Sequence, residues 1–172
     1  VEEVVICLEY PNVKTLQVIF NIFRQKPLEV LFPEAYKKGV GILARVPLAS
    51  GLLTGKYSKE HVFEENDHRR FNENGEAFNV GETFAGLGFK NGVELAEQLK
   101  WIAEGRPTMA SAALRWILDQ QEVTCVIPGF KNIQQIDSNL QALEARTFSQ
   151  EEQEKLRTFY EEKVEHLIRG AY

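Results

Sequence analysis

Residues 126–140 read VIPGFKNIQQIDSNL, a passage from a buried strand into a helix. The apolar run ends at Pro128 and Gly129, and polar residues with helical spacing begin near Asn132. Strands that pass directly into helices are the repeating unit of α/β proteins, in which helical crossovers join parallel strands. This stretch therefore predicts an α/β fold with a parallel sheet.

The same turn carries side chains that are suited to hold an anion. Gly129 lets a backbone pass close to a ligand, and free amides at a helix N-terminus attract negative charge. Lys131 precedes the first helical turn, where its ammonium group can pair with a phosphate. Gln135 and Asn139 are four residues apart and share one helical face. A capped turn whose amides are solvated is an equally good interpretation of this pattern.

A second strand exit lies at residues 42–57, which read ILARVPLASGLLTGKY. After Pro47 come two glycines and several small residues, which let the backbone lie close to a ligand. Such segments after parallel strands recur where backbone amides surround a phosphate. The eight-residue P-loop pattern is absent, and a tight turn without a ligand is the alternative.

The hydrophobic pattern of the whole chain predicts strands and helices in alternation. Three strands are predicted, each buried on both faces because almost every position is apolar: 15–21, 39–46 and 123–128. Helices are predicted at 2–9, 28–38, 90–104, 108–120, 132–143 and 149–165, the last opened by a capping box of Ser149 and Glu152. Three parallel strands leave two apolar edges, so the sheet is either small and open or part of a larger one.

Composition places the chain among ordinary globular proteins. Its 172 residues are 44% hydrophobic and 26% charged, with a net charge of −5. This acidic balance argues against a nucleic-acid partner, whose binders usually carry a basic face. The apolar runs are far shorter than the ~20 residues of a membrane span, and the acidic first residues do not form a signal peptide. We therefore expect a cytoplasmic protein with no membrane insertion.

Cysteine and histidine give weak signals for chemistry. Cys7 and Cys125 lie inside apolar runs without a partner spacing, so we expect reduced thiols in the core rather than a disulfide. His61 and His68 lie in a polar segment with acidic residues between them. Histidines seven apart in such a segment favour a solvated loop over a metal site, and we expect no metal.

Together, the two strand exits resemble the C-terminal half of the aldo-keto reductases, NADP-dependent (β/α)8-barrel enzymes. The resemblance rests on PLASGLLTGKY, on VTCVIPGFKN and on the spacing of Gly129, Lys131, Gln135 and Asn139. LQVIFNIFR looks like the family's sixth strand, and FEENDHRRFN falls in the long loop after the seventh. The resemblance covers essentially all of residues 1–172. It implies the last three βα units of a TIM-type barrel, in which phosphate sites after strands seven and eight are common.

The resemblance implies a role for each matching residue. Gln17 matches the glutamine that hydrogen-bonds the nicotinamide carboxamide. Lys131 matches the basic residue that holds the 2′-phosphate, which favours NADP over NAD, while Gln135 and Asn139 match the pair on the adenine side. The residues that match the loop around the pyrophosphate are Val46, Pro47, Leu48, Ser50 and Leu52.

Two positions depart from the family pattern. Arg45 stands where many members have a tyrosine that stacks on the nicotinamide. A guanidinium can stack on that ring as well, but its charge repels the oxidised form, so we expect Arg45 to favour the reduced cofactor. Val46 replaces the usual serine and removes one hydroxyl donor to phosphate, leaving more of that work to backbone amides.

The family's catalytic Asp, Tyr, Lys and His lie on early strands, and none of them maps onto this chain. The chain begins about where the helix after the fifth strand begins, and it lacks an initiator methionine. We therefore assign no catalytic residue and expect the N-terminal half of the barrel to be supplied upstream. The polar stretch at about 57–86 would then be a lid-like loop, with residues 68–71 over the cofactor or the substrate; a mobile loop held only by its phenylalanines is the alternative.

Two functions follow from the resemblance. The first is an NADPH-dependent oxidoreductase that reduces an aldehyde or ketone, a small carbonyl substrate whose identity the sequence does not specify. The second is a non-catalytic NADP-binding subunit, of the channel-associated type or a true half-barrel. A homo-oligomer is compatible with either function.

Overall fold

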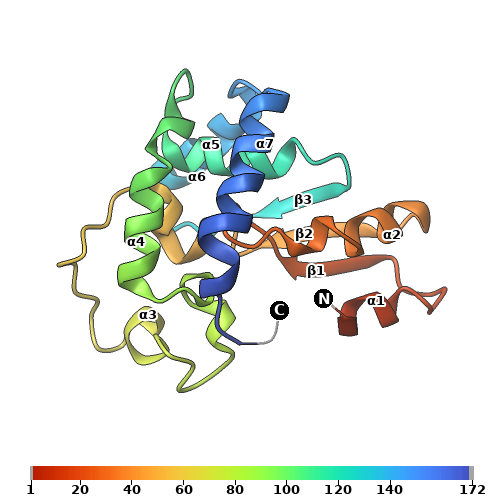
Figure 1. Cartoon of the computed structure of the whole chain (residues 1–172), viewed down its shortest axis with the longest axis horizontal. Coiled ribbons are helices and arrows are strands. Elements are labelled where there is room, and N and C mark those ends of the chain that lie inside the picture. The colour runs from red at the N-terminus through yellow and green to blue at the C-terminus, as the bar shows by residue number, and fades with distance from the viewer. Residues whose placement is uncertain (1, 171–172) are drawn as a thin grey trace.

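The computed structural model describes residues 2–170, which contain a three-stranded parallel sheet. Its strands are β1 (Thr15–Ile19), β2 (Gly41–Arg45) and β3 (Val123–Ile127), side by side in chain order (Figure 1). Ile19 pairs with Arg45, and Arg45 pairs with Ile127. The predicted parallel α/β architecture is therefore confirmed, and all three strands end at the same edge of the sheet.

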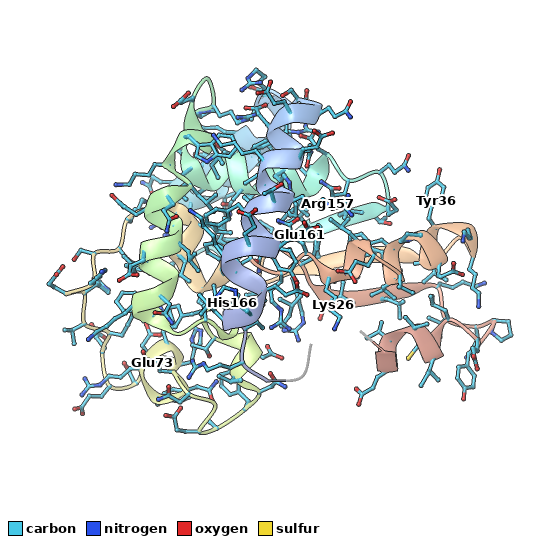
Figure 2. The ribbon with its side chains drawn as sticks, in the orientation of Figure 1. Lys26, Tyr36, Glu73, Arg157, Glu161 and His166 are labelled. Carbon is cyan, nitrogen blue, oxygen red and sulfur yellow. The ribbon has the colours of Figure 1, made fainter. Side chains whose placement is uncertain are left out.

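Helices follow the strands in the predicted order. The α-helices are α1 (Glu2–Cys7), α2 (Leu31–Lys37), α3 (His68–Phe71), α4 (Phe89–Gln98), α5 (Met109–Leu118), α6 (Ile133–Glu144) and α7 (Gln150–Phe159). The chain continues from α7 as a π-helical segment (Tyr160–Val164) and a 3₁₀ turn (Glu165–Leu167). Arg157 of α7 reaches across this junction to Glu161, with 3.2 Å between Nε and Oε1 (Figure 2). No helix within residues 2–170 has both the length and the apolar character that a membrane crossing requires.

Local chemistry explains where these helices begin and end. The predicted capping box of Ser149 and Glu152 opens α7, and a second one, formed by Thr108 and Ser111, opens α5. Gly39 ends α2 with a φ of 66°, which a residue without a Cβ adopts without strain. The helix predicted over 28–38 begins only at Leu31, because a separate 3₁₀ turn (Lys26–Leu28) precedes it.

The prediction that the strands are buried on both faces is wrong. In β1, Leu16 and Val18 are buried while Thr15 and Gln17 are exposed. Helices α2 and α5 pack against one face of the sheet, and in the described residues no element covers the face that carries Gln17. The apolar residues of the strands therefore lie on two faces, one covered by helices and one that residues 2–170 leave open, as in a sheet that lines a barrel interior.

The prediction that the cysteines form no disulfide is confirmed, but the prediction that they lie in the core is wrong. Both Cys7 and Cys125 are free, but both are exposed. Cys125 pairs with Leu43 on the open face of β3, which is also an edge strand of this sheet. β3 itself leaves Thr124 and Ile127 exposed, so its apolar composition reflects surfaces that residues 2–170 do not cover.

The long stretch at 57–86 is more ordered than its composition predicts. It contains α3 and two 3₁₀ turns (Val80–Glu82 and Phe84–Gly86), and it lies beside the end of α4 (Figure 1). Buried Asn72 holds it from within: its amide donates to Thr83 Oγ1 at 3.0 Å, and its oxygen accepts from the backbone of Ala77 and Phe78. Arg169 holds it from outside by donating to the carbonyls of Gly86 and Glu73.

An ion-pair network around the buried Arg106 joins the turn before α5 to the first turn of α7 and to the connection between α6 and α7. The Arg106 side chain has no exposed surface, lies 3.6 Å from the centre of the Phe148 ring, and contacts Glu152 at 3.1 Å. Arg146 contacts the same carboxylate at 2.7 Å. Burial raises the pKa of Glu152, but the hydrogen bonds from Arg146 and Arg106 outweigh it and lower the pKa to about 2. Glu152 is therefore ionised at neutral pH and bridges two cations.

Replacing Glu152 by Gln should reduce stability in a pH-dependent manner. Glutamine keeps the capping box but removes the charge, so we expect a loss of about 1–3 kcal/mol at pH 7. Because the folded-state pKa lies below the ordinary value of 4.5, the contribution is fully present above that pH and is lost as the pH falls toward about 2. Urea unfolding at pH 7 and at pH 3 should show a smaller difference between variant and wild type at pH 3.

Glu151→Gln is the matched control, because Glu151 is the exposed neighbour in the same helical turn. It should change the free energy of unfolding by less than about 0.5 kcal/mol. Equal losses for the two variants at pH 7 would contradict a specific role for Glu152.

Candidate functional site

The two segments singled out in the sequence leave the sheet at the same edge. Residues 46–54 follow β2, and residues 128–132 follow β3, whose last residues are paired as Arg45 and Ile127. Gln17 lies on the neighbouring strand β1, opposite Leu43, with its side chain on the open face of the sheet. The register therefore places the candidate residues of three strands along one rim.

The segment after β2 has a strained backbone. Val46, Ala49 and Ser50 have φ values of 53°, 48° and 57°. Positive φ is uncommon outside glycine, and for a β-branched residue such as Val46 it is a true outlier. Strain of this kind persists only where the surroundings enforce it, and it concentrates at functional sites.

Buried Asn21, which the sequence analysis missed, enforces this conformation. Its side-chain amide donates to the carbonyl of Val46 at 2.9 Å, and its oxygen accepts from the Phe23 amide at 2.9 Å. It has no exposed surface. The only signal in the sequence is a polar residue at the end of an apolar run, because its partner is twenty-five residues away.

Ser50 joins the strained segment to the long loop. Its hydroxyl donates to the carbonyl of Glu82 at 3.4 Å and accepts from the Phe84 amide at 3.0 Å. Phe84 and Ala85 also have positive φ values, 50° and 55°. The hydroxyl expected at a pyrophosphate loop is therefore already engaged with the backbone at the end of the 57–86 stretch.

Arg45 forms a forked ion pair with Glu82 across the same junction. Its two terminal nitrogens lie 2.6 and 2.7 Å from the two carboxylate oxygens. The mutual hydrogen bond raises the pKa of Arg45 and lowers the pKa of Glu82, so both groups are charged at neutral pH. The sequence pattern points to Arg45 but not to its partner, because Glu82 is one of several acids in a polar stretch.

The remaining candidates of this segment are mostly packed inward. Pro47 is buried and Leu48 is half-buried. Leu52 is buried against Gly92 of α4, where an added Cβ would lie 2.3 Å from its Cδ1. Pro47 and Leu52 therefore offer a ligand only their backbone, whereas Leu48 keeps part of its side chain exposed.

The turn after β3 is organised by its own side chains. Asn132 caps α6 by accepting from the Gln135 amide at 2.9 Å, and Gln135 Oε1 accepts from the Lys131 amide at 2.6 Å. Asn139 donates to the carbonyl of Gly129 at 3.4 Å. A Cβ added at Gly129 would meet nothing within 4 Å. The four motif residues thus lie together on an open surface.

Lys131 is the exposed cation of this turn. Its side chain forms no salt bridge with any of residues 2–170. A free ammonium group, the amides at the start of α6 and the exposed amide of Gln17 match the phosphates and the carboxamide of a nicotinamide dinucleotide in chemistry.

The other polar side chains of the long loop form a separate cluster. Arg69 donates to the Tyr57 hydroxyl at 2.6 Å and pairs with Asp67, whose pKa is strongly lowered by this hydrogen bond. The rings of Tyr57, His61 and Phe63 contact one another. Residues 2–170 contain no group of three or more His, Cys, Asp or Glu side chains that could hold a metal. Arg69 is therefore committed to holding the loop, whereas Arg70 and Phe71 are exposed.

Comparison with known proteins identifies the class of protein. A parallel sheet whose βα units carry a phosphate-type site at the carboxyl ends of the strands is typical of (β/α)8 barrels. The sequence profile described as "Aldo/keto reductase family" matches residues 1–161. The chain belongs to the aldo/keto reductase family, and its three strands form part of that barrel.

Individual relatives agree with this assignment. The chain is 38% identical over 115 residues to L-glyceraldehyde 3-phosphate reductase of Escherichia coli O157:H7, covering 66% of this chain and 32% of that protein. It is 33% identical over 143 residues to aldo-keto reductase str7 of Strobilurus tenacellus, covering 81% of this chain and 40% of that protein. It therefore spans less than half the length of these relatives.

Solved structures show the same fold. The glycerol dehydrogenase AKR11B4 from Gluconobacter oxydans superposes with a TM-score of 0.67 at 25% identity, over 92% of this chain and 45% of that one. The holo form of aldo-keto reductase AKR11C1 from Bacillus halodurans gives a TM-score of 0.57 at 23% identity, over 91% and 46%.

Removing the Asn21 side chain should destabilise the site. Asn21→Ala leaves the Val46 carbonyl and the Phe23 amide without their partner in a buried setting, so we expect a loss of about 2–3 kcal/mol in the free energy of unfolding. Urea unfolding of the intact protein measures it. Asn91→Ala, at an exposed position on α4, should cost less than about 0.5 kcal/mol. A loss for Asn21→Ala no larger than that of the control would show that the Val46 conformation does not depend on this side chain.

Proposed function

We propose that the protein is an NADP-dependent oxidoreductase that reduces aldehydes or ketones to alcohols. The observation that carries the proposal is the shared rim, where the strained segment after β2 and the open Lys131 turn after β3 emerge side by side. The names of its relatives support carbonyl reduction, and one structural neighbour was solved in a holo form. Bound NADPH supplies a hydride in such a reaction.

Each candidate residue has a proposed task toward the dinucleotide. Gln17 hydrogen-bonds the nicotinamide carboxamide from the open face of β1, and Arg45 lies beside the ring. Lys131 pairs with the 2′-phosphate, which favours NADP over NAD, and Gln135 and Asn139 contact the adenine side. The pyrophosphate is held by backbone groups of the segment that contains Val46, Pro47, Leu48, Ser50 and Leu52, and by the start of α6 after Gly129.

The proton donor for the carbonyl is proposed to lie outside this chain. Within residues 2–170, Tyr36 points from α2 into solvent (Figure 2). Tyr57 packs against Gly51 of the segment after β2, but its hydroxyl is bonded to Arg69. We therefore propose that this chain supplies most of the cofactor site and that the general acid comes from the first strands of the barrel.

The exposed apolar surface supports a partner of that kind. Ile133, Leu140 and Leu143 lie exposed along α6, and Ile133 is 72% exposed. Ile127 of the adjoining edge strand is exposed as well. We propose that the N-terminal half of the barrel covers this surface, with residues 1–172 as the C-terminal part and 57–86 as its loop over the cofactor. The cytoplasmic location and the oligomeric state stay predictions.

The enzyme should consume NADPH only in the presence of a carbonyl compound. We expect the absorbance of NADPH at the nicotinamide band to fall when the intact protein is mixed with NADPH and glyceraldehyde or benzaldehyde, with the alcohol formed in equal amount. Tight NADPH binding without turnover across a panel of aldehydes and ketones would instead support a non-catalytic NADP-binding subunit. Failure to bind either NADPH or NADP⁺ would contradict both functions.

Lys131→Ala should weaken NADPH binding selectively. Loss of a charge-assisted contact to the 2′-phosphate predicts a rise of at least about tenfold in the dissociation constant of NADPH, with NADH within about twofold. Fluorescence titration with the two cofactors measures this difference. Lys90→Ala, at an exposed position on α4, is the control and should leave both constants unchanged. Equal losses for NADPH and NADH in Lys131→Ala would contradict the assignment.

A further inference from the structure

Arg45, the last residue of β2, forms a forked ion pair with Glu82, so its positive charge lies directly against a carboxylate. Both terminal nitrogens of Arg45 are used, at 2.6 and 2.7 Å, so the plane of the guanidinium is determined by one carboxylate. The side chains are 31% and 34% exposed, so water screens the pair only in part. Within residues 2–170, Glu82 is the acid paired with Arg45.

Glu82 is rigidly placed although it belongs to a polar loop. It ends the 3₁₀ turn Val80–Glu82, which is capped where the Asn79 side chain accepts from the Gly81 amide at 2.8 Å. Its own carbonyl accepts from Ser50, and the following residue, Thr83, is buried and bonded to Asn72. The carboxylate is therefore delivered to Arg45 by a structured backbone.

The two redox forms of a nicotinamide differ in charge at the ring. The oxidised ring is a cation and the reduced ring is neutral, so an uncompensated guanidinium nearby penalises the oxidised form alone. A carboxylate locked onto that guanidinium cancels most of its field, because the pair is a small dipole rather than a net charge. The preference of the site for one redox form therefore depends on whether Arg45 is paired.

We infer that Glu82 is a positioning and specificity residue that holds the Arg45 plane and neutralises its charge, so that NADP⁺ and NADPH bind with similar affinity. This inference rests on the proposed function, because it requires the nicotinamide to lie beside Arg45. It reverses the expectation from the sequence alone, in which an isolated Arg45 favours the reduced cofactor. It also gives the 57–86 loop a task at the ring itself, since that loop carries the compensating charge.

The test is the ratio of the dissociation constants of NADP⁺ and NADPH, measured by calorimetric titration of the intact protein. In Glu82→Gln, the unpaired Arg45 should raise this ratio by at least about fivefold, mainly through weaker NADP⁺ binding. In the double variant Arg45→Gln with Glu82→Gln, the ratio should return to within about twofold of wild type. Glu64→Gln removes an exposed charge from the same loop and should leave the ratio unchanged.

A second single variant, Arg45→Gln, should change the ratio of the dissociation constants in the opposite direction. The test therefore does not depend on the correct folding of Glu82→Gln alone. Arg45→Gln leaves Glu82 unpaired and should lower the ratio, because a lone carboxylate attracts the oxidised ring. An unchanged ratio in both folded single variants, checked by thermal unfolding, would overturn the inference while leaving the proposed function intact. Wild-type protein that binds neither form would instead show that the proposed function is wrong.

Discussion

The parallel register of the three strands is the constraint on which the other features depend. Ile19, Arg45 and Ile127 end in one row because β1, β2 and β3 run in the same direction and pair in sequence. Every segment that follows a strand must then leave the sheet at that row. A slip of one residue in β2 would turn Arg45 to the helical face and separate it from Glu82. The candidate cofactor site exists only in this register.

Buried polar side chains fix the conformation of the segments that leave the sheet at this edge. Asn21 spans the exits of β1 and β2, and Asn72 organises the interior of the long loop. Such groups are costly when unpaired, so each one strongly favours the single conformation in which it is satisfied. This explains how Val46 and Phe84 persist at positive φ. Rigidity at the rim therefore arises from a few long-range hydrogen bonds rather than from the sheet alone.

Much of the fold could be predicted from local chemistry. The three strands, the order of the helices and the Ser149–Glu152 capping box follow from periodicity and from residues close in sequence, and the structure confirms them. Predictions of burial that required knowledge of which surfaces are covered were wrong, as the exposure of Cys125 and of the strand face that carries Gln17 illustrates. An apolar strand has the same sequence pattern whether its second face packs against helices of this chain or against a surface outside residues 2–170. The order of the 57–86 stretch was also missed, because the bonds of Asn72 within the loop leave no periodic pattern and Arg169 reaches it from ninety-six residues away.

The sequence by itself determined the class of fold, the family and the spacing of Gly129, Lys131, Gln135 and Asn139, because all of these depend on patterns within a few helical turns. Only the tertiary structure decided which charge compensates Arg45, what holds Val46 in its strained conformation and which strand face remains open. Those features join residues that are far apart in the chain, such as Arg45 and Glu82. A pairwise electrostatic or hydrogen-bonding contact leaves no local periodicity, so it becomes visible only when the strands have brought its partners together.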